Sequence, residues 1–190
     1  MKKFNTILGI AAAASLTGSS LAGIVSLSVA ADSIGSGLYA GYTGAKITIT
    51  MNIDDTASAV AGEITSNWSI AITQGSSTLL AGTGTSSFTV FDMGGSTFKM
   101  ESALLGGVWT VVGGLTPEPN QIQISYAGEP SDTLLAAISA SAGTTDGRLT
   151  VGTISGSDVG ALIGEYTVVP APSALVLLAG GLVLARRRRA

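Results

Sequence analysis

The acidic side chains are the main candidates for chemistry in this sequence, because its 190 residues include no histidine and no cysteine. Zinc sites, haem ligation and the common nucleophile–base pairs usually need one of those two residue types. Asp54 and Asp55 are adjacent and directly follow a strand-like segment, so their carboxylates are expected to point to opposite faces. A catalytic carboxylate pair must instead share one cleft. We interpret both as solvated carboxylates at a strand end and expect no catalytic residue and no enzymatic activity.

Three further aspartates, Asp132, Asp146 and Asp158, fall in loop-like segments. Carboxylates in loops are the usual ligands of Ca²⁺, but none of these three shows the dense Asp-x-Asp-x-Asp spacing of a recognised calcium loop. The sequence also lacks a Gly-x-Gly-x-x-Gly between a strand and a helix and a phosphate-loop lysine. We therefore expect no metal and no cofactor, with a loop calcium site as the remaining alternative.

Aromatic residues offer a different chemistry, the stacking of a sugar ring. Trp68 shares the apolar side of its predicted strand with isoleucines, which favours packing in the core. Trp109 lies in a segment, 108–112, that is apolar on both faces, so its ring can be buried or exposed. Trp109, or Tyr39 with Tyr42, is the predicted stacking platform if the protein binds a surface polysaccharide.

The elements that must position these residues are β-strands. Apolar and polar residues alternate over 45–53 and over 63–73, which predicts two strands with one buried and one solvated face. Glycine-rich segments, among them Gly82-Thr83-Gly84, predict turns. Residues 133–142 fit either a short helix or another strand, and we favour the strand. Further short strands are predicted at 78–81, 86–91, 96–101, 108–112, 121–126, 148–154 and 164–169.

Short strands separated by turns at intervals of roughly 8 to 15 residues are typical of all-β domains. We predict an antiparallel β-sandwich or jelly-roll-like ectodomain over residues 23–167. Its charge is strongly acidic: twelve carboxylates and three cations lie between residues 23 and 170, a formal charge of about −9. Such a domain is repelled by phosphate backbones, so we expect no nucleic-acid partner.

The first 22 residues have the organisation of a secretory signal peptide. A basic start, 1–6, precedes an apolar stretch of about ten residues, 7–16, and Ser20-Leu21-Ala22 has the small-x-small pattern of a cleavage site. We predict cleavage after Ala22. Ala30 is a second candidate, but residues 24–30 alternate like a strand. The alternative is an uncleaved N-terminal anchor. The expected partners are the export translocon and signal peptidase.

The C-terminal tail, 168–190, has three parts. Pro170-Ala171-Pro172-Ser173 precedes an apolar run, and together they predict a transmembrane helix over 173–185. The apolar run 174–185 is about 18 Å long as a helix, short against a hydrocarbon core of about 30 Å. The tail then ends in a basic cluster that favours the cytoplasmic side of a membrane and leaves residues 23–170 outside the cytoplasm. This cluster is Arg186, Arg187, Arg188 and Arg189.

This tail resembles the PEP-CTERM sorting signal, in which Pro-Glu-Pro, a short helix and an Arg cluster follow one another. Ala171 replaces the glutamate, as in the Val-Pro-Ala-Pro variants of the family. The resemblance implies processing by exosortase, a membrane-embedded protease. A literal Pro-Glu-Pro also occurs at 117–119, but no apolar run follows it, and we interpret it as a loop.

Together these features predict an exported bacterial protein that is sorted through the envelope membrane to the cell surface or extracellular matrix and has a structural role there. The expected partners are an exosortase-like protease, the membrane through the tail helix, and a surface polysaccharide. The alternative is a carbohydrate-binding envelope module held by an uncleaved single-span anchor. An envelope hydrolase with paired carboxylates is the least favoured hypothesis.

Overall fold

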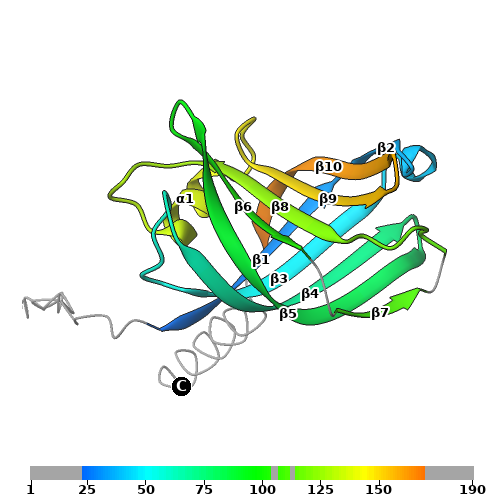
Figure 1. The fold of residues 1–190 in the computed structure, drawn as a ribbon, viewed down its shortest axis with the longest axis horizontal. Helices are drawn as coiled ribbons and strands as arrows, with labels where there is room; N and C mark the ends of the chain where they lie inside the picture. The colour runs from blue at the N-terminus through cyan, green and yellow to red at the C-terminus, as the bar shows by residue number, and fades with distance from the viewer. Residues whose placement is uncertain (1–22, 104–106, 112–113, 170–190) are drawn as a thin grey trace, which may run out of the picture.

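The computed structural model describes residues 23–103, 107–111 and 114–169. Strands dominate them, with one α-helix and one 3₁₀ turn (Figure 1). The elements in chain order are β1 (Ile24–Asp32), β2 (Ile34–Gly37), η1 (Ala40–Tyr42), β3 (Lys46–Asp54), β4 (Glu63–Gln74), β5 (Ser77–Gly94), β6 (Thr97–Ala103), β7 (Val108–Val111), β8 (Gln121–Ala127), α1 (Leu134–Ser141), β9 (Arg148–Ser155) and β10 (Asp158–Val169).

The strands form one antiparallel sheet that closes into an eight-stranded barrel in the order β1-β3-β4-β5-β6-β8-β9-β10. Pairing of β1 with β10 closes the ring, from Ser28 opposite Val169 to Ala31 opposite Tyr166. The short strands add to this ring, β2 beside β10 and β7 beside β5. The all-β prediction is confirmed. The shape is a barrel and not the predicted sandwich or jelly roll, because the first and last strands pair with each other and remove the edges that two separate sheets would keep.

Alternation of apolar and polar residues explains why the chain forms these strands. In β3, Ile47, Ile49, Met51 and Ile53 are buried inside the barrel, and the polar residues between them face outward. The predicted strands at 45–53 and 63–73 are therefore confirmed as β3 and β4. The same period places one side of every long strand in a single apolar core.

The predicted turn at Gly82-Thr83-Gly84 is wrong. The predicted strands at 78–81 and 86–91 are parts of one continuous strand, β5, and Gly82 and Gly84 lie within it. Gly84 is directly opposite Trp68 of β4, and Gly82 is directly opposite Trp109 of β7. A Cβ on Gly84 would come within 2.6 Å of Cζ2 of Trp68, and one on Gly82 would collide with the ring of Trp109. The glycines provide room for tryptophans, not a change of chain direction.

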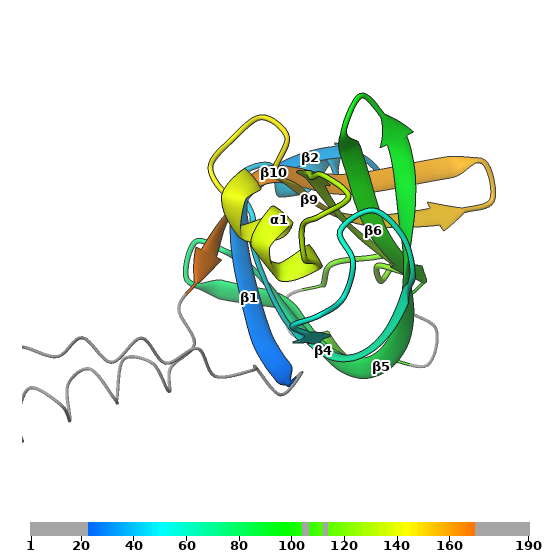
Figure 2. The same ribbon diagram turned by 90° about the vertical axis from the view of Figure 1, so that its left-hand side faces the viewer.

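The predicted strand at 133–142 is also wrong, because most of this segment forms α1. Thr133 is the N-cap, and its hydroxyl accepts a hydrogen bond from the backbone N–H of Ala136 at 3.3 Å. The buried residues Leu134, Ala137, Ile138 and Ser141 recur at helical spacing, so one face of α1 packs on the core. Figure 2 shows α1 lying across one end of the barrel.

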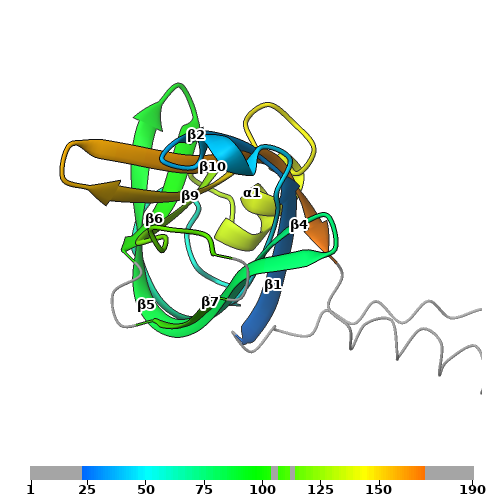
Figure 3. The same ribbon diagram turned by 90° about the vertical axis from the view of Figure 1, so that its right-hand side faces the viewer.

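The opposite end of the barrel is covered by η1 and by residues 114–120, which lead into β8 (Figure 3). The hydroxyl of Tyr39 donates to the carbonyl of Pro117 at 2.6 Å, and that of Tyr42 donates to the carbonyl of Gly114 at 2.8 Å. Leu115 of the same segment is fully buried. Residues 117–119 lie in this loop, as predicted for the internal Pro-Glu-Pro.

The two boundaries of the barrel both lie at the end that α1 covers. The carbonyl of Gly23 accepts a hydrogen bond from the backbone N–H of Asp55 at 3.0 Å, and the carbonyl of Ala57 accepts one from the first residue of α1 at 2.7 Å. Near the end of β10, the hydroxyl of Tyr166 donates to the carbonyl of Ile138 in α1 at 3.0 Å. The chain therefore enters and leaves the barrel at one end.

Several predicted features lie outside the described residues. These are the signal peptide 1–22 with Ala22, the motif Pro170-Ala171-Pro172-Ser173, the tail helix 173–185 and the cluster Arg186–Arg189. Within the described ranges, no helix has the length and apolar character needed to cross a membrane.

Candidate functional site

The adjacent aspartates after β3 stabilise the turn that follows. Asp54 Oδ1 accepts hydrogen bonds from the side-chain hydroxyl of Thr56 at 2.6 Å and from its backbone N–H at 2.8 Å. These bonds, the side-chain one first, lower the pKa of Asp54. Asp55 Oδ1 accepts from the backbone N–H of Gly23 at 2.9 Å. The two carboxylates thus serve different backbone segments, as expected for acids at the end of a strand.

The three loop aspartates lie in separate parts of the fold. Asp132 precedes α1 and accepts a hydrogen bond from the backbone N–H of Glu129 at 2.9 Å, Asp146 precedes β9, and Asp158 begins β10. Among the residues that the structure describes, no group of three or more acidic side chains could hold a metal ion. The fold does not bring the three aspartates together.

The aromatic residues predicted as a stacking platform are mostly turned inward. Tyr39 is fully buried, so its role as a platform is wrong. Tyr42 packs edge-on against it, with ring centroids 6.1 Å apart. Trp68 is buried, as predicted, and donates from Nε1 to Ser86 Oγ at 2.9 Å. Trp109 packs against Trp68 with ring centroids 5.4 Å apart and is partly buried on the core.

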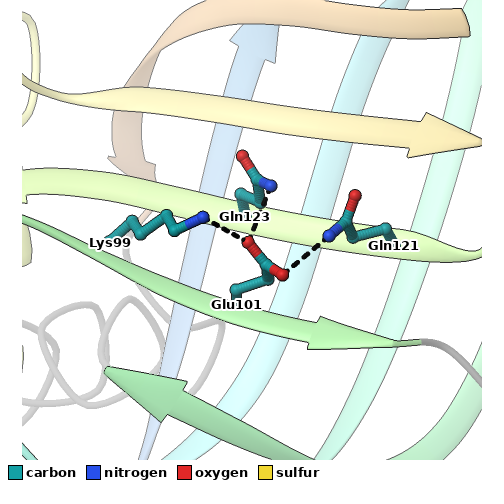
Figure 4. A network of polar contacts seen from close by, with 4 residues as sticks. All are labelled: Lys99, Glu101, Gln121 and Gln123. Carbon is teal, nitrogen blue, oxygen red and sulfur yellow. Dashed lines mark hydrogen bonds and ion pairs between the residues drawn. The ribbon is translucent and has the colours of Figure 1, made fainter. Parts of the chain in front are cut away.

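A polar cluster that was not predicted lies on the outer face of β6 and β8 and is centred on Glu101 (Figure 4). Its carboxylate accepts three hydrogen bonds: from Lys99 Nζ at 2.7 Å, from Gln121 Nε2 at 2.7 Å and from Gln123 Nε2 at 2.8 Å. The register of β6 against β8 brings these side chains together, because Glu101 is directly opposite Gln123 and Gln121 is its diagonal neighbour. Only about a quarter of the Lys99 and Glu101 side chains is exposed, 24% and 22%.

Phe91 on β5 extends this cluster on one side. It is directly opposite Lys99, and the Lys99 ammonium lies 5.2 Å from the centroid of its ring. Phe91 is a large apolar side chain that is exposed to solvent, with an exposed fraction of 43%. We call the set of Phe91, Lys99, Glu101, Gln121 and Gln123 the Glu101 patch.

The bonds within the Glu101 patch determine what it can do chemically. The oxygens of the Glu101 carboxylate already accept three hydrogen bonds from the protein's own donors, one of them an ammonium, so they are poorly placed to take a proton from a substrate. Each amide uses one N–H in its bond to Glu101, and an amide carries a second N–H and a carbonyl oxygen as well. The patch is therefore suited to hydrogen bonding with a polar ligand and not to acid–base chemistry.

A second outer surface, which we call the hydroxyl groove, lies over β3, β4, β5 and β7. It has a volume of about 340 Å³, and the described residues that line it are hydroxyl-bearing or apolar and uncharged. The hydroxyl-bearing ones are Thr48, Thr50, Ser69, Thr83 and Thr110. Cross-strand pairing of Thr50 with Ser69 and of Ser69 with Thr83 sets these three in a row. In contrast to the Glu101 patch, none of the described residues that line this groove is aromatic.

Sequence reasoning missed the Glu101 patch because its parts are separated along the chain. The signal was present only as two short alternations, Lys99-x-Glu101 and Gln121-x-Gln123, each of which places two polar residues on one face of a strand. Comparisons with known proteins return no match: no family model, no curated protein and no solved structure is significantly similar to this chain.

Proposed function

We propose that this chain is an exported, surface-sorted protein with a structural or matrix-associated role, whose C-terminal tail inserts into the membrane and is processed by an exosortase. The observation that supports the proposal is the extent of the barrel, which fills the chain between the two predicted sorting signals. Strand β1 begins at Ile24, two residues after the predicted cleavage site at Ala22. Strand β10 ends at Val169, immediately before Pro170. Processing at both boundaries leaves every barrel strand whole.

The pairing of β1 supports cleavage after Ala22 over cleavage after Ala30. All nine residues of β1, from Ile24 to Asp32, pair with β3, and four of them also pair with β10. Removal of residues up to Ala30 would delete most of this strand, together with the buried side chains of Leu27 and Val29. The barrel would lose most of the pairing between β1 and β10 that closes it, so an exported protein cut there would not keep this fold.

The common location of the two boundaries supports display on a membrane. Because β10 ends next to the sorting motif, a tail inserted in the membrane brings the α1 end of the barrel close to the bilayer. The outer walls and the end covered by η1 then face away from it. The bonds already made by Asp54, Asp55 and Glu101 support a role without catalysis.

The experiment is mass spectrometry of both termini of the mature protein from the envelope and surface fractions of a host that carries an exosortase. We expect an N-terminus at Gly23 and loss of Arg186–Arg189. The variant Pro170→Ala with Pro172→Ala should retain the arginines. Glu118→Ala, in the internal Pro-Glu-Pro, is the matched control and should be processed normally.

The result that contradicts the proposal is an intact Arg186–Arg189 cluster on the wild-type protein at the surface. That result favours the second candidate, a carbohydrate-binding module with an uncleaved single-span anchor.

A further inference from the structure

We propose that the Glu101 patch binds a neutral saccharide chain. The inference goes beyond the proposed sorting function and does not depend on it, because it rests on the outer wall of the barrel and not on either terminus. It also moves the stacking platform away from Tyr39, Tyr42 and Trp109, which pack against other parts of the fold.

The polar side chains of the Glu101 patch are preorganised for binding. Gln121 and Gln123 both donate to Glu101, so each amide group is already held by a hydrogen bond before any ligand arrives (Figure 4). The ammonium of Lys99 is fixed in turn by Glu101 and by the ring of Phe91. A ligand that binds here does not have to immobilise these long side chains, which is the usual cost of surface recognition.

The free donors and acceptors of the Glu101 patch match the hydrogen-bonding groups of a sugar. A sugar hydroxyl both donates and accepts, so its receptor must offer both kinds of group. The amides of Gln121 and Gln123 have both kinds, and the ammonium of Lys99 has three N–H donors, one of which is directed to Glu101. Three polar side chains held together by a shared carboxylate provide such a mixed set along two neighbouring strands.

The exposed ring of Phe91 adds an apolar surface beside these polar groups. A pyranose ring presents C–H groups on its face and hydroxyls on its rim, so it gains most where an apolar surface lies next to polar groups. Phe91 lies directly opposite Lys99 on the neighbouring strand and continues the outer face of the patch. The patch spans three strands, β5, β6 and β8, which at about 4.8 Å per strand spacing is about 10 Å, the length of a short oligosaccharide segment.

The charges of the patch and of the surrounding barrel favour a neutral ligand. The charges of Lys99 and Glu101 compensate each other within the patch. The rest of residues 23–169 contains eleven carboxylates and two cations, which disfavours the approach of a polyanion. A neutral glycan suits a patch without net charge on an acidic barrel, and an anionic polysaccharide does not.

The test is affinity electrophoresis of the mature exported protein in gels that contain a soluble neutral glucan, either dextran or hydroxyethylcellulose, with alginate as the anionic polymer. A glycan array of neutral oligosaccharides refines the choice of sugar. We expect retardation by a neutral polymer and none by alginate. Phe91→Ala and Gln123→Ala should each weaken binding by about tenfold.

Thr83→Ala in the hydroxyl groove is the matched control and should bind like the wild type. Thermal unfolding of each variant shows that the barrel is intact. The proposal is overturned by a folded wild-type protein that binds no neutral glycan, by a preference for alginate, or by binding that survives Phe91→Ala combined with Gln123→Ala. These outcomes are independent of whether the tail is processed.

Discussion

The inner and outer faces of the same strands differ in how closely the fold constrains them. On the inner face of β5, Gly82 and Gly84 leave just enough room for the rings of Trp109 and Trp68. On the outer face of β5 and β6, Phe91 and Lys99 are in contact with solvent and pack against each other. The difference indicates that the inner face maintains the barrel, while the outer face is free to carry a binding function. The following predictions test that division.

The largest effect is expected from alkaline pH, which acts on the inner side. Burial raises the pKa of Tyr39, Tyr126 and Tyr166 well above the ordinary 10.0. Above pH 10 the unfolded chain releases these protons and the folded barrel retains them, so stability is complete below pH 10 and is lost above it. Each buried tyrosine contributes a loss of about 1.4 kcal/mol per pH unit in that window.

Absorbance at 295 nm, recorded together with circular dichroism from pH 8 to 12, measures this effect. We expect these three tyrosines to ionise together with the loss of β structure. Ionisation of Tyr39, Tyr126 and Tyr166 in a barrel that remains folded would contradict the prediction.

A smaller but still large effect is expected from Gly84→Val. The new side chain faces the indole of Trp68, where a Cβ alone would already come within 2.6 Å. Overpacking of this kind should lower the free energy of unfolding by about 3 kcal/mol in urea titrations. Thr83→Val, on the outer face of the same strand, is the control and should change it by less than about 0.5 kcal/mol. Equal stability of the two variants would contradict the division between the faces.

The smallest effect on stability is expected from Glu101→Gln on the outer face. The substitution removes the charge that holds Lys99 but keeps a group that can accept hydrogen bonds from the amides. The free energy of unfolding should fall by less than about 1 kcal/mol, because the ion pair is partly exposed. Glycan affinity should fall as well, with a more unfavourable binding entropy in calorimetry, because the single amide oxygen of the new glutamine cannot hold all three donors that the carboxylate holds. An unchanged entropy would exclude Glu101 as a positioning residue.

The strands with clean alternation were predictable from the sequence, and the closure of the barrel was not. Ile47, Ile49, Met51 and Ile53 identify β3 because each lies two residues from the next on one face. The pairing of Ser28 with Val169 depends on strands that lie far apart in the chain, and no local pattern reports it.

Two local errors have physical causes. A glycine supports a turn and also makes room for a neighbouring ring, and the sequence around Gly82 and Gly84 does not distinguish the two uses. The short apolar segment of α1 fits both the helical and the strand period, so the capping hydroxyl of Thr133 was the better signal. The Glu101 patch required the register of β6 against β8, which brings together residues about twenty positions apart.

The most direct test of the account combines two readouts on one outer-face variant, Phe91→Ala with Gln123→Ala. We predict a free energy of unfolding within about 1 kcal/mol of the wild type and a neutral-glucan affinity at least tenfold weaker. An unchanged affinity, or a loss of affinity that only follows a loss of stability, would contradict the claim that the inner face maintains the fold and the outer face binds the ligand.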